Sequence, residues 1–161
     1  MKKREQGFTL IEVIVVIAIM GILLSITGVG IPAYQNFIDR QKLKRETKNV
    51  YYSILQARND AIMDGVKRKV FILPHENAIK IDKNTILEKN IKLSDEMEIY
   101  ISTYESNKFN NKLELKPIGT ISAGGHITLK SLMGHYTTIV VQPISGRIYM
   151  YEGMYREEEN G

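Results

Sequence analysis

The sequence predicts an α+β protein: one long N-terminal α-helix, followed by a small and mainly antiparallel β head. Residues 8–31 form an apolar run with one charge, and residues 32–64 repeat apolar side chains at helical spacing. From residue 67 onward, short alternating segments are separated by turn residues. We therefore expect a leader (1–7), a membrane-spanning first half of the helix (8–31), an amphipathic second half (32–64) and a β-rich head (65–161).

Composition limits the range of functions. The 161 residues suit one modest domain, and the formal charge of +4 is weak support for nucleic-acid binding as a main role. The first six residues, with three cations and one glutamate, supply +2 of that charge and leave +2 for the rest. The sequence has no cysteine, which excludes disulfides, thiol catalysis and cysteine metal sites.

The apolar run is long enough to cross a bilayer. At about 1.5 Å per residue, a helix over residues 8–31 covers a hydrocarbon core of about 30 Å with some tilt. A buried helix of a soluble protein is disfavoured because the run has no polar face, and a cleaved secretory signal is disfavoured by the length of the run. Three cations precede the run and five follow it, so charge counting leaves its orientation open.

Two glycines and a proline interrupt the end of this run. Pro32 removes a helical hydrogen bond and crowds the preceding turn, while Gly28 and Gly30 lower helix propensity. We expect a kink between Gly28 and Pro32. The alternative is that one helix ends at Pro32 and a second one begins.

Glu12 is the single charge of the apolar run. A carboxylate in hydrocarbon costs about 2.5–3.5 kcal/mol on insertion scales, so such a residue indicates a function and requires a partner. The run contains no lysine or arginine to pair with it. The alternative is a glutamate near the membrane surface that stays hydrated.

The segment KKREQGFTLIEVIVVIAIMGILL resembles the N-terminus of type IV prepilins and pseudopilins, with a basic leader that ends in glycine before Phe-Thr-Leu-Ile-Glu. The resemblance implies recognition of the leader by prepilin peptidase, cleavage between Gly7 and Phe8 on the cytoplasmic side, and N-methylation of Phe8. It also implies that Glu12 pairs with the N-terminal amine of a neighbouring subunit during assembly. The leader cations concerned are Lys2, Lys3 and Arg4.

The same resemblance implies a structural role, with no cofactor, metal or enzymatic activity. The expected partners are other pilin or pseudopilin subunits, prepilin peptidase, membrane lipid, and the inner-membrane platform and assembly ATPase of the machine. Before assembly, the chain would be a single-pass membrane protein with a cytoplasmic N-terminus and the head outside. Afterwards it would lie in a filament, at the cell surface or in the periplasm.

The second half of the helix has an apolar seam, with Leu55 and Ile62 expected to widen it and Gly65 expected to cap its end. Several cations near its start could contact lipid phosphates, neighbouring subunits or DNA, although a solvated face is the simplest interpretation. The seam consists of Leu43, Thr47, Val50, Ile54, Ala57 and Ala61, and the cations are Arg40, Lys42, Lys44, Arg45 and Lys48.

The head shows short strand signals. We expect strands over 68–73, 78–81, 91–94, 97–103, 112–116 and 137–143, a turn at Gly124-Gly125 leading into another strand, and a closing hairpin through residues 143–146. In the last strand, Ile148 and Met150 would share one face, with Tyr149 and Tyr151 opposite.

The head is also similar to GspH/FimT-type minor pseudopilins and to the ComGD competence group. This similarity rests on LQARNDAIMDGVKRKVFI, GHITL and TTIVVQPISGRIYMYEG, and it implies a minor subunit. Residues 75–118 match no family that we can name.

We find no catalytic constellation. The three histidines, His75, His126 and His135, lack the spacing of a helical metal pair, and the acidic segment at 156–160 is best interpreted as a solvated tail rather than a calcium site. A DNA- or surface-binding head, and a component of a type II secretion pseudopilus, are the alternative functions. A membrane-tethered enzyme is disfavoured.

Overall fold

The computed structural model describes residues 8–103 and 112–155, apart from the side chains of residues 26–30. The predicted leader residues Lys2, Lys3, Arg4 and Gly7 lie outside the described residues. The chain divides into two compact units, Met1–Ile38 and Asp39–Gly161.

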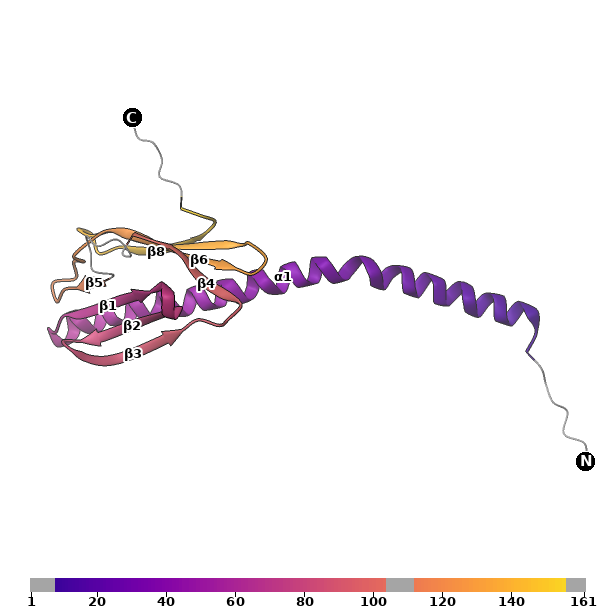
Figure 1. Ribbon diagram of the computed structural model, residues 1–161, viewed down its shortest axis with the longest axis horizontal. Helices are drawn as coiled ribbons and strands as arrows, with labels where there is room; N and C mark the ends of the chain where they lie inside the picture. Colours follow the sequence, from indigo (N-terminus) through magenta and orange to yellow (C-terminus); the bar gives the residue numbers. More distant parts are fainter. Residues whose placement is uncertain (1–7, 104–111, 156–161) are drawn as a thin grey trace, which may run out of the picture. The chain divides into compact units, whose positions relative to one another are not determined.

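A single helix, α1 (Leu10–Asp64), belongs to both units (Figure 1). Its assignment is continuous across Pro32, so the alternative of two helices that meet at this proline is wrong. The Asn36 side chain donates a hydrogen bond to the Pro32 carbonyl (3.0 Å). The kink between Gly28 and Pro32 stays a prediction. The helix ends as expected before Gly65, whose φ of +69° suits a residue without a Cβ atom.

The predicted seam of α1 is buried throughout, since every one of its six members is at most 4% exposed. One of the two flanking residues differs from the prediction. Leu55 is half-buried, but Ile62 is 44% exposed. Ser53 is buried near the seam instead, with its hydroxyl bonded to the Asn49 carbonyl at 2.7 Å.

The strands form two four-stranded antiparallel sheets in the second unit (Figure 1). The first sheet has the order β3-β2-β1-β5, and the second has the order β4-β6-β7-β8. The strand bounds are β1 (Arg68–Leu73), β2 (Ala78–Lys83), β3 (Ile86–Lys92), β4 (Met97–Ser102), β5 (Lys112–Leu115), β6 (Gly125–Ser131), β7 (Tyr136–Val141) and β8 (Ile148–Glu152), with a short 3-10 helix η1 (Pro74–Glu76) after β1.

The strand predicted over 91–94 is misplaced, because β3 starts earlier and ends at Lys92. Most of β3 is exposed, so it lacks the alternation on which the prediction depends. After Lys92 the chain continues its pairing with the β2 side for one hydrogen bond and then turns toward α1. The Leu93 amide donates to the Asn77 carbonyl (3.0 Å), and the Ser94 amide donates to the Glu46 carboxylate (3.1 Å).

The inner faces of both sheets and the seam of α1 share one hydrophobic core. Ile148 is buried in it and Met150 packs against it, as the alternation of β8 predicts. Asn77 connects the two sheets. It adopts the left-handed conformation after η1, and its side chain bonds to the Met97 carbonyl (2.6 Å) and the Ile99 amide (3.2 Å) of β4.

An ion network fixes the end of α1 to the first sheet. The buried guanidinium of Arg68 bonds to Asp64 (2.9 Å) and Glu88 (2.8 Å), and Lys83 adds a contact of 2.8 Å to Asp64. The hydrogen bonds from Arg68 and Lys83 hold the pKa of the Asp64 carboxyl well below its usual range. A buried arginine is thus neutralised where the helix passes into β1.

Candidate functional site

The start of α1 carries the strongest functional signal. Thr9 precedes the first helical residue, and its backbone amide and its hydroxyl each donate a hydrogen bond of 3.1 Å to Glu12 Oε2. In return, the Glu12 amide donates to the Thr9 hydroxyl at 3.4 Å. This reciprocal arrangement is a capping box, in which two otherwise unpaired donors of a helix start are satisfied by side chains.

The capping box gives Glu12 a partner within its own chain. Thr9 is not among the functional residues predicted above, because the predicted partner of Glu12 is a cation. The T-x-x-E pattern of Thr9-Leu10-Ile11-Glu12 is the signal that could have found it. The carboxylate also lies in the first helical turn, where the partial positive charge of the helix N-terminus stabilises an anion.

Glu12 is surrounded by exposed apolar side chains. Phe8 is 86% exposed, and each large hydrophobic side chain from Leu10 to Leu24 is at least 47% exposed. A helix that is apolar on all sides is stable only where other apolar groups or lipid cover it. Among the described residues of the first unit, therefore, a single fixed carboxylate lies at the start of an apolar surface that requires a partner.

In the part of the chain described with side chains, no helical stretch is both long and apolar enough to qualify as a membrane span.

The five cations near the start of the second unit are partly neutralised within the head. Lys42 pairs with Glu96 and Lys44 pairs with Glu152, each at 2.7 Å. The hydrogen bond from Lys44 holds the pKa of the Glu152 carboxyl below its usual range. Arg45 and Lys48 have no ion-pair partner among the described residues. The cluster is thus less basic than its sequence suggests.

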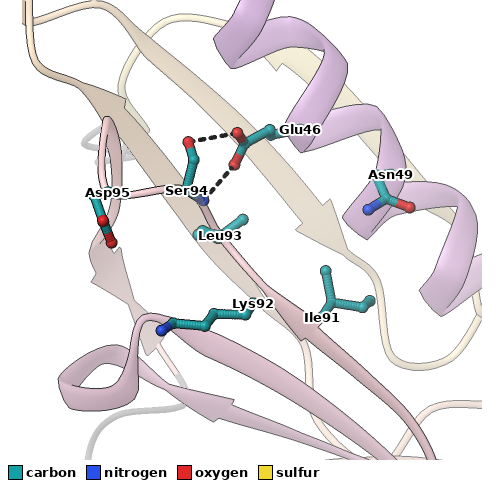
Figure 2. A pocket seen from close by; sticks show the side chains of 7 residues that line it. All are labelled: Glu46, Asn49, Ile91, Lys92, Leu93, Ser94 and Asp95. Atoms are coloured by element: carbon teal, nitrogen blue, oxygen red, sulfur yellow. Dashed lines mark hydrogen bonds between the residues drawn. The ribbon is translucent and has the colours of Figure 1, made fainter.

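A hollow of about 500 Å³ lies between α1 and the turn after β3 (Figure 2). Its main polar group, Glu46, is already used: its two carboxylate oxygens accept hydrogen bonds from the Ser94 hydroxyl (2.6 Å) and amide (3.1 Å). Asn49, Lys92 and Asp95 complete its polar lining. Because the same carboxylate also holds the Ser94 amide, this arrangement fixes the loop after β3 to the helix.

The histidines have separate local roles. His126 Nδ1 lies 2.8 Å from the Thr103 hydroxyl, and its ring stacks on Tyr155. His135 accepts a hydrogen bond from Arg40 Nε (3.4 Å). Among the described residues, no group of three or more potential ligands is placed to hold a metal ion.

The N-terminal segment has clear relatives. Residues 2–28 match the family model described as "Prokaryotic N-terminal methylation motif". The chain is 51% identical over 45 residues to a type IV major fimbrial protein, FimA of Dichelobacter nodosus. The matched segment is 28% of this chain and 27% of that protein. The chain is 40% identical over 63 residues to a fimbrial protein of Pseudomonas aeruginosa, which is 39% of this chain and 38% of that protein. The matched part is thus well under half of each relative.

The fold has a solved counterpart. The structure of the minor pseudopilin EpsH, from the type 2 secretion system of Vibrio cholerae, superimposes with a TM-score of 0.55 at 11% identity. The match covers 69% of this chain and 97% of EpsH. At this identity, the similarity shows a shared fold: a long N-terminal helix packed on antiparallel sheets.

Proposed function

We propose that this chain, which has the N-terminal motif and the fold of the type IV pilin and pseudopilin family, is a structural subunit of a type IV pilus or a related pseudopilus. The observation that carries the proposal is the single carboxylate, Glu12, held by Thr9 at the start of an exposed and wholly apolar helical surface. The EpsH-like fold supports assignment as a minor subunit. The comparisons favour neither a DNA-binding nor a surface-binding head.

The first step is processing by prepilin peptidase. Cleavage between Gly7 and Phe8 removes the basic leader and creates a new amino group on Phe8, which the same enzyme methylates. This amine is a cation that does not exist before cleavage. Processing would therefore supply the counter-ion that the apolar run lacks in the sequence.

Membrane residence is the second step. Residues 8–31 would span the bilayer with the N-terminus in the cytoplasm and the head outside, which is supported by the apolar sequence of this segment. The capping box supports this step too. It provides hydrogen bonds to one oxygen of the carboxylate and to two backbone amides at the start of the helix, where lipid offers none.

Assembly is the third step. The apolar surface of α1 would exchange lipid for neighbouring helices, while the platform and ATPase of the machine extract the subunit. Both hydrogen bonds from Thr9 go to Glu12 Oε2, so the other carboxylate oxygen would accept a hydrogen bond from the amine of Phe8 on an adjoining subunit. An ammonium and a carboxylate paired directly would replace two unpaired buried ions, each of which would cost several kcal/mol.

Two measurements test this proposal: the chemical state of the N-terminus and the amount of the subunit in filaments. Mass spectrometry of the mature chain should find Phe8 as a methylated N-terminus. Glu12→Ala should leave cleavage intact but deplete the subunit in sheared filaments, whereas Gly7→Ala should block cleavage itself. Glu12→Ala subunits at wild-type levels in quantified filaments would refute the assembly role, and an intact Met1 in the native protein would refute processing.

A further inference from the structure

The turn between β6 and β7 exposes two apolar side chains at its tip. Leu132 is 76% exposed and Met133 is 47% exposed. The turn is well defined, because the Gly134 amide donates to the Ser131 carbonyl (2.9 Å) and Gly134 adopts a φ of +80°. The two adjacent side chains thus form a small exposed apolar patch at the tip of an ordered turn.

This turn is fastened to the first helical turn of the second unit. The Ser131 hydroxyl donates a hydrogen bond to the buried carboxylate of Asp39, and the His135 amide donates to the same hydroxyl (3.2 Å). Arg40 Nε in turn donates to His135 Nε2 (3.4 Å). The side chains of Leu132 and Met133 are therefore held near the guanidinium of Arg40. Arg40 is the second residue of the second unit, so the turn lies beside the start of that unit.

The opposite side of the turn is fixed as well. The Leu132 amide donates to the Glu96 carbonyl (3.1 Å), and the Glu96 carboxylate pairs with Lys42 on α1. Backbone bonds on both sides leave the side chains of Leu132 and Met133 as the free part of the turn. The surface is therefore pre-organised, so contact with a partner requires little further ordering.

Chain length limits how far this surface can lie from a bilayer. Asp39 follows Ile31, the last residue of the apolar run, by eight positions. Even a fully extended chain of that length spans only about 28 Å, and a helix spans about 12 Å. If a membrane holds residues 8–31, Asp39, to which this turn is bonded, can therefore lie at most about 28 Å of chain from the end of the apolar run.

We propose that the tip formed by Leu132, Met133 and Arg40 docks on the bilayer surface before assembly. This inference rests on the proposed membrane step. Leu132 and Met133 enter the boundary between headgroups and acyl chains, and Arg40 contacts lipid phosphates, which combines the apolar and cationic parts of an interfacial anchor. The head would then be held at a defined orientation until extraction breaks this contact.

The absence of cysteine allows a direct test. The full chain with Met133→Cys is labelled with an environment-sensitive fluorophore and reconstituted into phosphatidylethanolamine–phosphatidylglycerol vesicles at low protein density, with a quencher on the lipid. The matched control is Ile144→Cys, on the turn at the other end of β7 and 89% exposed. The two turns are separated by the length of β7, roughly 20 Å.

Quenching at residue 133 should exceed quenching at residue 144 at least threefold, and Arg40→Gln should reduce it. Equal quenching at both positions would overturn the proposal. So would a signal at 133 that rises with protein density rather than with quencher, because it would identify a second copy as the occupant. An Ile17→Cys label reports the membrane step separately: quenching there alone refutes only the docking, whereas no quenching there refutes the membrane step and the docking together.

Discussion

The hydroxyl and the amide of Thr9 both lie 3.1 Å from Glu12 Oε2, so the single carboxylate of the apolar run caps the helix within its own chain. Capping and the proposed pairing with a neighbouring subunit depend on different properties of Glu12. Capping needs an acceptor oxygen, whereas pairing with an ammonium group needs a negative charge. Substitutions can separate the two roles.

Glu12→Gln should separate charge from capping. The glutamine amide oxygen can still accept the bonds from Thr9, since capping boxes use Glu or Gln at this position. We expect normal cleavage and an unchanged start of α1, but depletion in sheared filaments equal to that of Glu12→Ala. Quantitative immunoblots of filament and membrane fractions measure it. If the glutamine variant assembles like the wild type, capping rather than charge pairing explains why assembly requires Glu12.

Thr9→Ala should weaken the helix start, because it removes the hydroxyl that links Glu12 Oε2 to the Glu12 amide. A lost cap costs about 1 kcal/mol, or roughly a fivefold faster opening. Hydrogen exchange of the full chain in detergent micelles should show this acceleration at the first turn of α1 and no change near Ala61. Thr9→Ser keeps a hydroxyl and is the matched control. Equal exchange in the two variants would contradict the capping box.

Two isoleucines of the same helix should differ sharply in their contribution to stability. Ile54 is fully buried in the core, so Ile54→Ala should lower the free energy of unfolding by about 2–5 kcal/mol. Ile62 is 44% exposed, and Ile62→Ala should change it by about 0.5 kcal/mol or less. Thermal unfolding of the full chain in micelles compares them. Similar losses for both variants would show that Ile62 belongs to the core.

Stability should fall in acid partly through Asp64. Arg68 and Lys83 lower the pKa of this carboxyl, so the folded state binds its proton less readily than the unfolded state, where the pKa is about 3.9. Its contribution is therefore complete above about pH 5 and is lost as the pH falls through the folded pKa. Melting temperatures from pH 7 to pH 2 should decline less steeply for Asp64→Asn.

The control for this pH series is Asp95→Asn, an exposed carboxylate with no ion-pair partner among the described residues. Its acid decline should match that of the wild type. A wild-type decline in Asp64→Asn as well would show that the ion network at Arg68 does not govern acid stability.

Local patterns predicted much of this fold. The 68–73 strand, the buried seam of α1 and the end of α1 before Gly65 are all found as expected, because each depends on side chains whose spacing matches a helix or a strand. The capping box is local as well, and its T-x-x-E pattern is present in the sequence as Thr9-Leu10-Ile11-Glu12. β3 was misplaced because an exposed edge strand buries little and leaves no alternation to detect.

By itself, the sequence determined the apolar run, its single carboxylate, the amphipathic half of the helix and the strand-rich head, because these depend on neighbours in the chain. The tertiary structure decided which residues far apart in the sequence are in contact. It divided the strands into two sheets, buried Arg68 between Asp64 and Glu88, and fastened the Leu132–Met133 turn beside Arg40. Such pairings depend on which surfaces fit together when distant parts of the chain meet. The spacing of apolar residues along the sequence does not show which distant residues will pair.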